Sequence, residues 1–292
     1  MSAGMVRSMT GFARVERMAA GAKIAWELRA VNSRFLDLTL KLPEEFRVLE
    51  SELRQRAQHK VSRGKLEVSL RYTLDGAAQS ALNVDLTRLA ALNTALDQVN
   101  AALGATATPD PVRVLSFPGV LQQQAFDFAA LHAEALTAFD TALVEFNKAR
   151  EREGARTADY LLERAASLEN FAALVKARAP LVRDAWMDKL RAKVADLGIE
   201  VEPQRLAQEA AMAAQRLDVD EELARLASHL IELRKALAGK ESVGRRLDFL
   251  MQEFNREANT TGSKSQDAEM TNHVVEMKVL IEQMREQIAN LE

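Results

Sequence analysis

The 292-residue sequence contains no cysteine, which excludes disulfide bonds, thiolate nucleophiles and zinc sites of the cysteine type. No run approaches the ~18 apolar residues that a membrane-spanning helix needs, and the first residues lack the apolar core of a secretory signal peptide. The P-loop, dinucleotide-binding, zincin and serine-hydrolase motifs are also absent. These absences predict a cytoplasmic protein with no membrane partner and no nucleotide cradle.

Charge is unevenly distributed along the chain. The net charge of −3 argues against a uniformly basic nucleic-acid-binding protein. Residues 29–71, however, contain ten Lys or Arg and six Asp or Glu, a net charge of +4. A basic N-terminal patch and an acidic helical region together suit a protein that holds a polyanion near a metal ion. Ordinary scatter of surface charge explains the same count equally well.

The order of strand-like and helical patterns predicts an α+β protein, with an N-terminal mixed β-sheet domain with helices, a long helical arm and a C-terminal α-helical bundle. Strands are expected at residues 6–19, 23–32, 35–42 and 66–74. Pro43 is expected to open a helix that runs to about Val61. The predicted domains are residues 1–124, which include the basic segment, the arm 125–202, and the helical domain 203–292, which includes an acidic and histidine-containing cluster.

Proline, glycine and aspartate mark the boundaries of the expected helices. Asp85 is a suitable N-cap, and a long helix is expected to begin after Asp127. Pro180 is expected to kink or end that helix, and Pro203 to begin another. The last fifty residues then predict two helices joined by a loop of small residues at 260–265.

Three polar side chains share one flank of the first C-terminal helix pattern. Arg246, Glu253 and Glu257 border its apolar stripe, which consists of Leu247, Leu250, Met251, Phe254 and Ala258. The final helix has apolar residues at heptad spacing from Met270 to Leu291, which is typical of a coiled-coil seam. Such a pair must pack its apolar side against another part of the protein, and its charged flank will border that contact.

A preceding helix, opening at residues 218–222, carries Glu222, Arg225 and His229 on one flank of its leucine stripe. If this flank faces Glu253 and Glu257, a carboxylate–imidazole pocket forms that suits Mg²⁺ or Mn²⁺. A cation there would activate water and neutralise charge on a phosphodiester. A half-buried, hydrogen-bonded histidine beside an exposed ion pair is the ordinary structural explanation, and spacing alone does not decide between the two.

Two other polar groups are weaker candidates. Glu269, His273 and Glu276 recur at helical spacing, but the pattern is more typical of an exposed helix face. Basic and amide side chains also surround two turns of the sheet domain and have the chemistry to grip phosphates and a ribose hydroxyl. These are Arg29, Asn32, Arg34, Arg63 and Lys65. Turn chemistry and surface charge explain the second set equally well.

Long segments at both ends of the sequence resemble the YicC-like family of bacterial proteins. The N-terminal segments are MVRSMTGFARVE, LRAVNSRFLDLTLKLPEEFRVLE and RGKLEVSLRY. The C-terminal segments are RLDVDEELARLASHL, GRRLDFLMQEFNREANTTGSKSQDAEMTN and VEMKVLIEQMREQIANLE. The resemblance spans essentially the whole chain and is loosest at about residues 125–200.

The resemblance implies a metal-dependent endoribonuclease of the bacterial cytoplasm, built as a ring-like homo-oligomer with a hexamer as the expected size. On this reading the predicted catalytic residues are His229, Glu253 and Glu257. The predicted ligands of Mg²⁺ or Mn²⁺ are these three together with Glu222 and Glu276. The predicted RNA-binding residues are Arg29, Asn32, Arg34, Arg63, Lys65, Arg245, Arg246 and Lys264.

Two alternatives to this mechanism stay open. His229 has the chemistry of a general base on the ribose 2′-hydroxyl, a route that needs no metal and leaves a cyclic 2′,3′-phosphate. A non-catalytic adaptor that delivers RNA to another nuclease would use the same heptads for assembly. The clustered carboxylates favour an enzyme, because a pure RNA-binding protein gains nothing from acids that face a polyanion.

Overall fold

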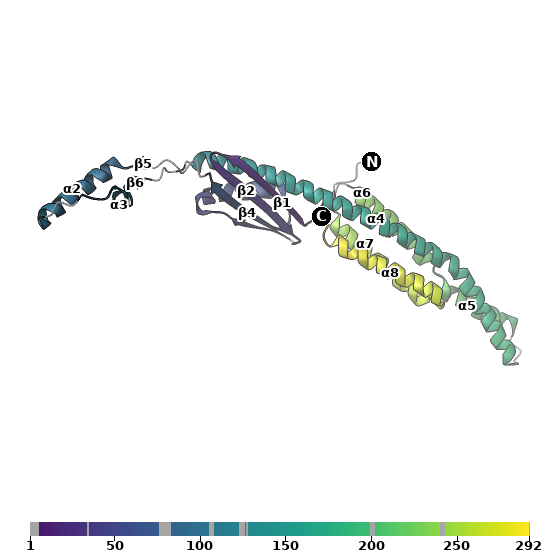
Figure 1. The fold of residues 1–292 in the computed structure, drawn as a ribbon. Helices are drawn as coiled ribbons and strands as arrows, with labels where there is room; N and C mark the ends of the chain where they lie inside the picture. Colours follow the sequence, from purple (N-terminus) through teal and green to yellow (C-terminus); the bar gives the residue numbers. More distant parts are fainter. Residues whose placement is uncertain are drawn as a thin grey trace. The chain divides into compact units, whose positions relative to one another are not determined.

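The computed structural model describes residues 6–33, 35–75, 83–104, 108–122, 126, 128–198, 202–239 and 243–291, and has the expected mixed α+β architecture (Figure 1). Contacts divide the chain into two compact units. One holds residues 12–29 and 35–146, and the other holds the remaining described residues. These units cut across the predicted ranges 1–124, 125–202 and 203–292, because a single helix, α4 (Phe128–Asp196), runs from one unit into the other.

The first unit is built on a four-stranded sheet with the order β1-β2-β4-β3. The strands are β1 (Gly11–Ala19), β2 (Ala22–Val31), β3 (Leu36–Lys41) and β4 (Gly64–Leu74). The turn between β1 and β2 consists of Ala20 and Gly21, whose φ angles of 49° and 73° match the positive values that a type I′ hairpin turn requires. The expected first strand, 6–19, begins later than predicted, because Ser8 instead forms an isolated bridge with Leu291.

A β–helix–β crossover completes the sheet. The 3₁₀ helix η1 (Glu44–Leu49) and helix α1 (Glu50–Lys60) connect β3 to β4, and the helix expected from Pro43 therefore begins with 3₁₀ geometry. This connection allows β3 and β4 to pair in parallel, with Leu36 opposite Gly64 and Lys41 opposite Ser69. In this register, side chains of β3 and β4 that point to the same face of the sheet lie next to each other.

One face of the sheet is buried against the N-terminal part of α4. The alternating residues Ile24, Trp26 and Leu28 of β2 are fully buried. The indole Nε1 of Trp26 donates a hydrogen bond of 2.9 Å to the carbonyl oxygen of Ala135, and the Trp26 and Phe139 ring centroids are 4.9 Å apart. The period-two pattern of β2 thus determines which face of the sheet packs and which stays open.

A small segment of the same unit pairs β5 (Asn83–Val84) with β6 (Leu121–Gln122) in antiparallel fashion and also holds α2 (Leu86–Leu103) and α3 (Pro111–Leu115). The Asp85 carboxylate accepts a hydrogen bond of 2.9 Å from the Arg88 amide, so the predicted N-cap is confirmed. Helix α2 has no buried residue although it is rich in leucine and alanine. Its apolar side chains are therefore open for contact with another surface.

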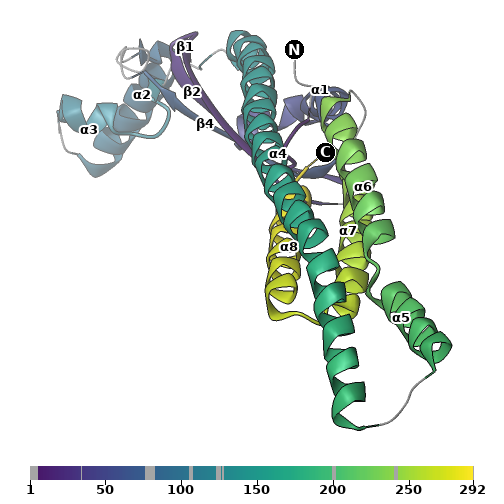
Figure 2. The same cartoon turned by 90° about the vertical axis from the view of Figure 1, so that its right-hand side faces the viewer.

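The second unit is helical. It comprises the later part of α4 together with α5 (Pro203–Leu217), α6 (Asp220–Ala238), α7 (Gly244–Lys264) and α8 (Ala268–Ile288). Helices α6, α7 and α8 lie beside α4 and share one apolar core with it (Figure 2). Within the described ranges, no helix is both long enough and apolar enough to cross a membrane.

One expected boundary in this unit is wrong, at residues 260–265. Pro180, which was expected to kink or end the long helix, does not end it, and α4 continues through Pro180 to Asp196. The loop expected at residues 260–265 is mostly the last turn of α7, and the connection to α8 begins only at Ser265. Thr260, Thr261 and Ser263 satisfy their hydroxyls within the helix by donating to the carbonyls of Arg256, Glu257 and Thr260.

Candidate functional site

The site is built on α6 and α7, which pack against each other and run in opposite directions. Ion pairs along the two helices show the register: Glu222 meets Lys264, Arg225 meets Glu257, and Glu232 meets Arg246. As residue numbers rise on α6, they fall on α7. The leucine stripes face inward in this register, and the polar flanks predicted from the sequence meet along one edge, which we call the α6–α7 seam.

The structure brings His229 of α6 together with Glu253 and Glu257 of α7. One potential ligand atom from each of the three side chains lies within 4.8 Å of the other two. We call these three residues the histidine–glutamate group. In the described part of the chain it is the one set of three or more His, Asp or Glu side chains with the spacing of a metal site. The predicted pocket required the flank of α6 that carries His229 to face the flank of α7 that carries Glu253 and Glu257, and the structure shows that they do.

The members of this group differ in their surroundings. The His229 ring stands edge-on to the buried ring of Phe254, with centroids 6.0 Å apart and an interplanar angle of 87°. This contact holds the imidazole at the edge of the core. Glu257 is buried, with 3% of its side chain exposed, whereas Glu253 and His229 are half-buried. The group thus has a closed inner side at Glu257 and an open outer side.

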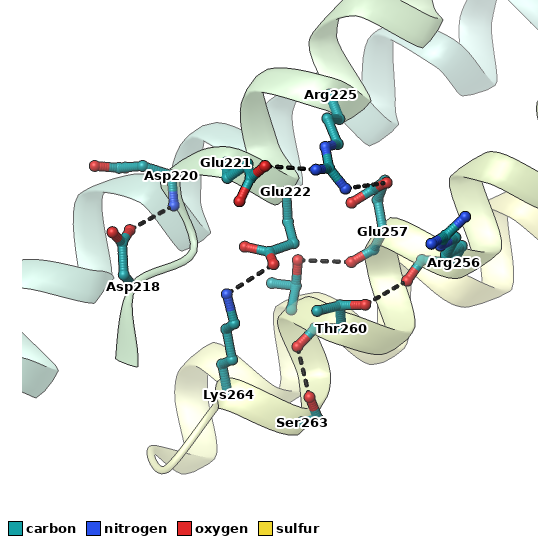
Figure 3. Close-up of polar contacts among 11 residues, drawn as sticks. Asp218, Asp220, Glu221, Glu222, Arg225, Arg256, Glu257, Thr260, Ser263 and Lys264 are labelled. Carbon is teal, nitrogen blue, oxygen red and sulfur yellow. Dashed lines mark hydrogen bonds and ion pairs between the residues drawn. The ribbon is translucent and has the colours of Figure 1, made fainter. Parts of the chain in front are cut away.

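Among the described residues, the cation that the structure places beside the buried carboxylate of Glu257 is Arg225, and the contact is loose. The Arg225 Nη1 lies 3.7 Å from the Glu257 Oε1, which is longer than a hydrogen bond, while Arg225 Nη2 donates to Glu221 at 2.5 Å (Figure 3). A buried carboxylate is costly unless a charge partner compensates it. The arrangement of one imidazole and two carboxylates suits Mn²⁺, and its oxygens suit Mg²⁺. The residues present therefore fit a divalent cation.

Two predicted site residues are engaged elsewhere on the seam. Glu222 accepts a hydrogen bond of 2.7 Å from the Nζ of Lys264, and Glu222 itself is buried (Figure 3). Because α7 extends to Lys264, this lysine lies on the helix rather than on the expected loop. Glu222 is not part of the histidine–glutamate group. Its role as a metal ligand, and that of Lys264 in RNA binding, stay predictions that this ion pair makes less favourable.

Helix α8 contributes no residue to the group. Glu276 is exposed on α8 and lies outside the histidine–glutamate group. The weaker candidate set around it is also dispersed. Glu269 forms an ion pair of 2.9 Å with Arg178 of α4, and the His273 ring lies 6.0 Å from that of Phe171. Glu269 and Glu276 are exposed, as the simpler interpretation of an exposed helix face expects, whereas His273 is half-buried beside Phe171.

The predicted RNA-binding residues are distributed over several surfaces. Arg29 and Lys65 are exposed on the neighbouring strands β2 and β4. The pKa of Glu67 lies below its usual range, chiefly because Lys41 donates a hydrogen bond to it, and Arg29 and Lys65 add to the effect. The open face of the sheet therefore gathers three cations around one carboxylate. Lys41 was not among the predicted RNA-binding residues. Its place in the period-two alternation of β3 was the sequence feature that could have identified it.

The other predicted RNA-binding residues have different positions. Asn32 donates from Nδ2 to the carbonyl oxygen of Ala289 at 2.7 Å, so its amide ties the chain to the end of α8. Arg63 is half-buried just before β4, and Arg245 is exposed in the first turn of α7. Arg246 forms an ion pair of 2.5 Å with Glu232 of α6. Arg34 lies outside the described residues.

Comparisons with known proteins show which family the chain resembles along its length. The family model described as "Endoribonuclease YicC-like, N-terminal region" matches residues 6–159, and "Endoribonuclease YicC-like, C-terminal" matches residues 175–292. A protein of Haemophilus influenzae named "Probable endoribonuclease YicC" is 41% identical over 288 residues, which cover 99% of this chain and all of that protein. A protein of the same name from Clostridioides difficile is 30% identical over 293 residues, covering 99% of this chain and all of that protein.

Proposed function

The chain belongs to the YicC-like endoribonuclease family, and from this premise we propose that it is a metal-dependent endoribonuclease that hydrolyses phosphodiester bonds of RNA. The observation that carries the metal dependence is the convergence of His229, Glu253 and Glu257 within 4.8 Å. Two carboxylates at one point would repel a polyanionic substrate. Their convergence with an imidazole is therefore better explained by a bound cation than by ordinary surface charge. The adaptor alternative is not favoured, because relatives along the full length carry the name of a nuclease.

Each member of the histidine–glutamate group has a distinct task in this proposal. Glu257, buried against the core, would hold the cation from the inner side and keep its position fixed. Glu253 and His229, which are half-buried, would complete the ligand set on the side open to solvent. When bound, the cation would lower the pKa of a water molecule and neutralise charge on the phosphate. Cations of the chain would hold the flanking RNA backbone.

The metal-free route through His229 is a second candidate for the same residues. In that route the imidazole removes a proton from the ribose 2′-hydroxyl, and the neighbouring phosphate is attacked within the same strand. The 2′-oxygen forms a bond to phosphorus as the bond to the 5′-oxygen breaks, which leaves a cyclic 2′,3′-phosphate. Attack by water activated at the cation leaves no cyclic product. The two routes are therefore distinguishable by their product ends.

We also propose a homo-oligomer in the cytoplasm, with a ring-like hexamer as the expected form. The exposed apolar side chains of α2 and α3 support assembly, since Leu86, Leu103 and Val112 are each more than 70% exposed in a segment with few buried residues of its own. Such exposed apolar residues are typical of an interface. Light scattering on the purified chain, compared with a Leu103→Glu variant, tests the assembly: a wild-type monomer would contradict it.

Cleavage of an end-labelled RNA by purified protein tests the nuclease proposal. The assay compares EDTA, Mg²⁺ and Mn²⁺, with Glu257→Gln purified in parallel as the matched variant, because glutamine keeps the volume of the buried side chain. We expect cutting with metal, none with EDTA, and a loss of at least a hundredfold in Glu257→Gln. Equal cutting by the wild type and the variant would place the activity at another site or in a contaminant.

A further inference from the structure

Two arginines flank the histidine–glutamate group along the α6–α7 seam. Arg225 lies one turn before His229 on α6, beside Glu257. Arg246 lies two turns before Glu253 on α7 and forms an ion pair with Glu232 of α6. The pKa of Glu232 is lowered chiefly by the hydrogen bond from Arg246. The His229 imidazole is close enough to add to this effect. In this antiparallel register the order along the seam is Arg225, the histidine–glutamate group and Arg246.

Each arginine is held in place by a glutamate and is still accessible. The Nη2 of Arg225 donates to Glu221 at 2.5 Å, and the Nη2 of Arg246 donates to Glu232 at 2.5 Å. Their side chains are 52% and 55% exposed. Exposed ion pairs of this kind contribute little to stability, so a phosphate can take the place of the glutamate on the guanidinium at little cost. A guanidinium has five donors in a planar fork that matches phosphate oxygens.

We infer that a single RNA strand lies along the α6–α7 seam, with Arg225 and Arg246 binding phosphates on the two sides of the bond that the histidine–glutamate group addresses. This inference rests on the proposed function and adds Arg225 as a substrate-binding residue together with a path for the strand. Arg225 and Glu232 are seven residues apart on α6, or roughly 10 Å along its axis. The spacing leaves room for one phosphate at the histidine–glutamate group between the two that the arginines bind.

The carboxylates of the histidine–glutamate group make such flanking cations necessary. Two glutamates repel a phosphodiester unless positive charge near them compensates. A cation in the group supplies part of that charge at one point only. Arginines on either side supply it along the strand, and they also fix the position of the strand relative to Glu257 and His229.

The matched glutamates provide a sharp test. Four single variants are compared, Arg225→Ala with Glu221→Ala and Arg246→Ala with Glu232→Ala, because each pair removes the same exposed ion pair from opposite sides. Arg225→Ala also removes the 3.7 Å contact with Glu257, so the melting temperature of each variant is measured beside its affinity. Binding of a fluorescent single-stranded RNA is followed by anisotropy in EDTA over a range of salt concentrations, with a gel to confirm that the RNA stays intact. The slope of log K against log salt concentration counts the phosphates that the protein neutralises.

We expect each arginine variant to weaken binding and to reduce the magnitude of the slope by about 0.7, which is the loss of one phosphate contact on a single strand. The glutamate variants should keep the wild-type slope and bind as well or more tightly. If each arginine variant matches its glutamate partner, the arginines act only through their ion pairs and the inference is wrong. Unchanged slopes in all four variants would also overturn it.

The nuclease assay run beside this experiment separates the two proposals. A wild-type protein that shows the expected slopes but does not cut RNA would refute the nuclease and leave the path of the strand standing. A wild-type protein that cuts RNA, with the affinity and slope of both arginine variants unchanged, would refute the path alone. Arg225→Lys adds a graded measurement, because lysine keeps the charge and loses the planar fork, so partial recovery of affinity is expected.

Discussion

The Nζ of Lys264, the last residue of α7, lies 2.7 Å from the Oε1 of the buried Glu222 on α6. The pair joins the end of one helix to the beginning of the other and satisfies one oxygen of a carboxylate whose side chain is only 8% exposed. The second oxygen, Oε2, has no hydrogen-bond partner among the described residues. Glu222 therefore depends on Lys264 for the compensation of its charge.

Lys264→Ala should destabilise the protein strongly, because it leaves the Glu222 carboxylate buried without a cation. We expect a loss of about 3 kcal/mol in the free energy of unfolding, the lower end of the range for broken buried pairs, since 26% of the Lys264 side chain is exposed. Urea denaturation at pH 7 measures it. The double variant Glu222→Leu with Lys264→Met should recover most of the loss, because it removes both charges and keeps apolar volume. A loss below about 1 kcal/mol would contradict this account, since that is the range of exposed pairs.

Binding of Mn²⁺ to the histidine–glutamate group should raise the melting temperature of the wild-type protein. A ligand at a hundred times its Kd that binds only the folded state stabilises it by about 2.7 kcal/mol. We expect Glu253→Gln to lose most of this shift in differential scanning calorimetry, because it removes a charged ligand from the group. Glu286→Gln, a change of the same kind on the exposed surface of α8, serves as the control. Equal shifts in melting temperature for the two variants would mean that the ion binds elsewhere. Glu276→Gln is measured in the same series, and a reduced shift in that variant would show that Glu276 is a ligand.

Local sequence patterns were enough to predict much of the fold and of the candidate site. Period-two alternation identified β2 and its buried Trp26, and the 3.6-residue period placed Glu253 and Glu257 on one flank of α7. The short connection between α6 and α7 then favours antiparallel packing, which is what brings His229 to that flank. That the flanks face each other depends on the rotation of each helix about its axis, and no single helix pattern contains that information.

These local patterns could not predict contacts between residues that are far apart in the sequence. Arg178 and Asp267 are 89 positions apart, and nothing in the local sequence of either residue identifies the other as its partner. The small residues at 260–265 suggested a loop because serine, threonine and glycine favour turns, but packing of α7 on α6 and α8 overrides that preference. Once Lys264 was assigned to a loop, its pairing with Glu222 could not be foreseen.

The Asp267 carboxylate should make stability depend on pH in the acid range. Its pKa is lowered from 3.8 to about 2, first because Arg178 donates hydrogen bonds of 3.0 and 2.9 Å to its two oxygens, and second because it accepts from the Met270 amide as the N-cap of α8. A folded-state pKa below the unfolded value gives a contribution that is fully present above about pH 4 and is lost as the pH falls to 2.

Asp267→Asn isolates this contribution, because asparagine keeps an N-cap acceptor and removes the charge. We expect the wild type to be more stable than the variant at pH 6 and the difference to shrink as the pH falls from 4 to 2. Denaturation of both proteins at a series of pH values, at constant ionic strength, measures the difference. A difference that stays constant over this range would show that the charge of Asp267 contributes nothing, whatever the other acids of the protein do.

At Gly154 of α4 the backbone of the N-terminal segment lies close against this helix. A Cβ atom at this position would lie 2.2 Å from the carbonyl oxygen of Val6 and 2.8 Å from the Cα of Arg7. Both are backbone atoms, so neither yields as a flexible side chain would. The segment is anchored beside it by hydrogen bonds in both directions between Ser8 and Arg150, of 3.0 Å to the Arg150 carbonyl and 2.7 Å from the Arg150 Nε.

Gly154→Ala therefore sets two effects of opposite sign against each other. In an exposed helix the change would stabilise the protein by up to about 1 kcal/mol, because alanine has the higher helix propensity. Here the added methyl group must push residues 6–8 away from α4, and overpacking of this kind costs about 1–3 kcal/mol. We expect a net destabilisation in urea titrations. Gly262→Ala in α7 is the matched control: its Cβ would meet only a side-chain atom, the Val274 Cγ1, at 3.3 Å, so stability should stay close to that of the wild type. A Gly154→Ala protein as stable as that control would mean that the N-terminal segment does not rest on α4 at this glycine.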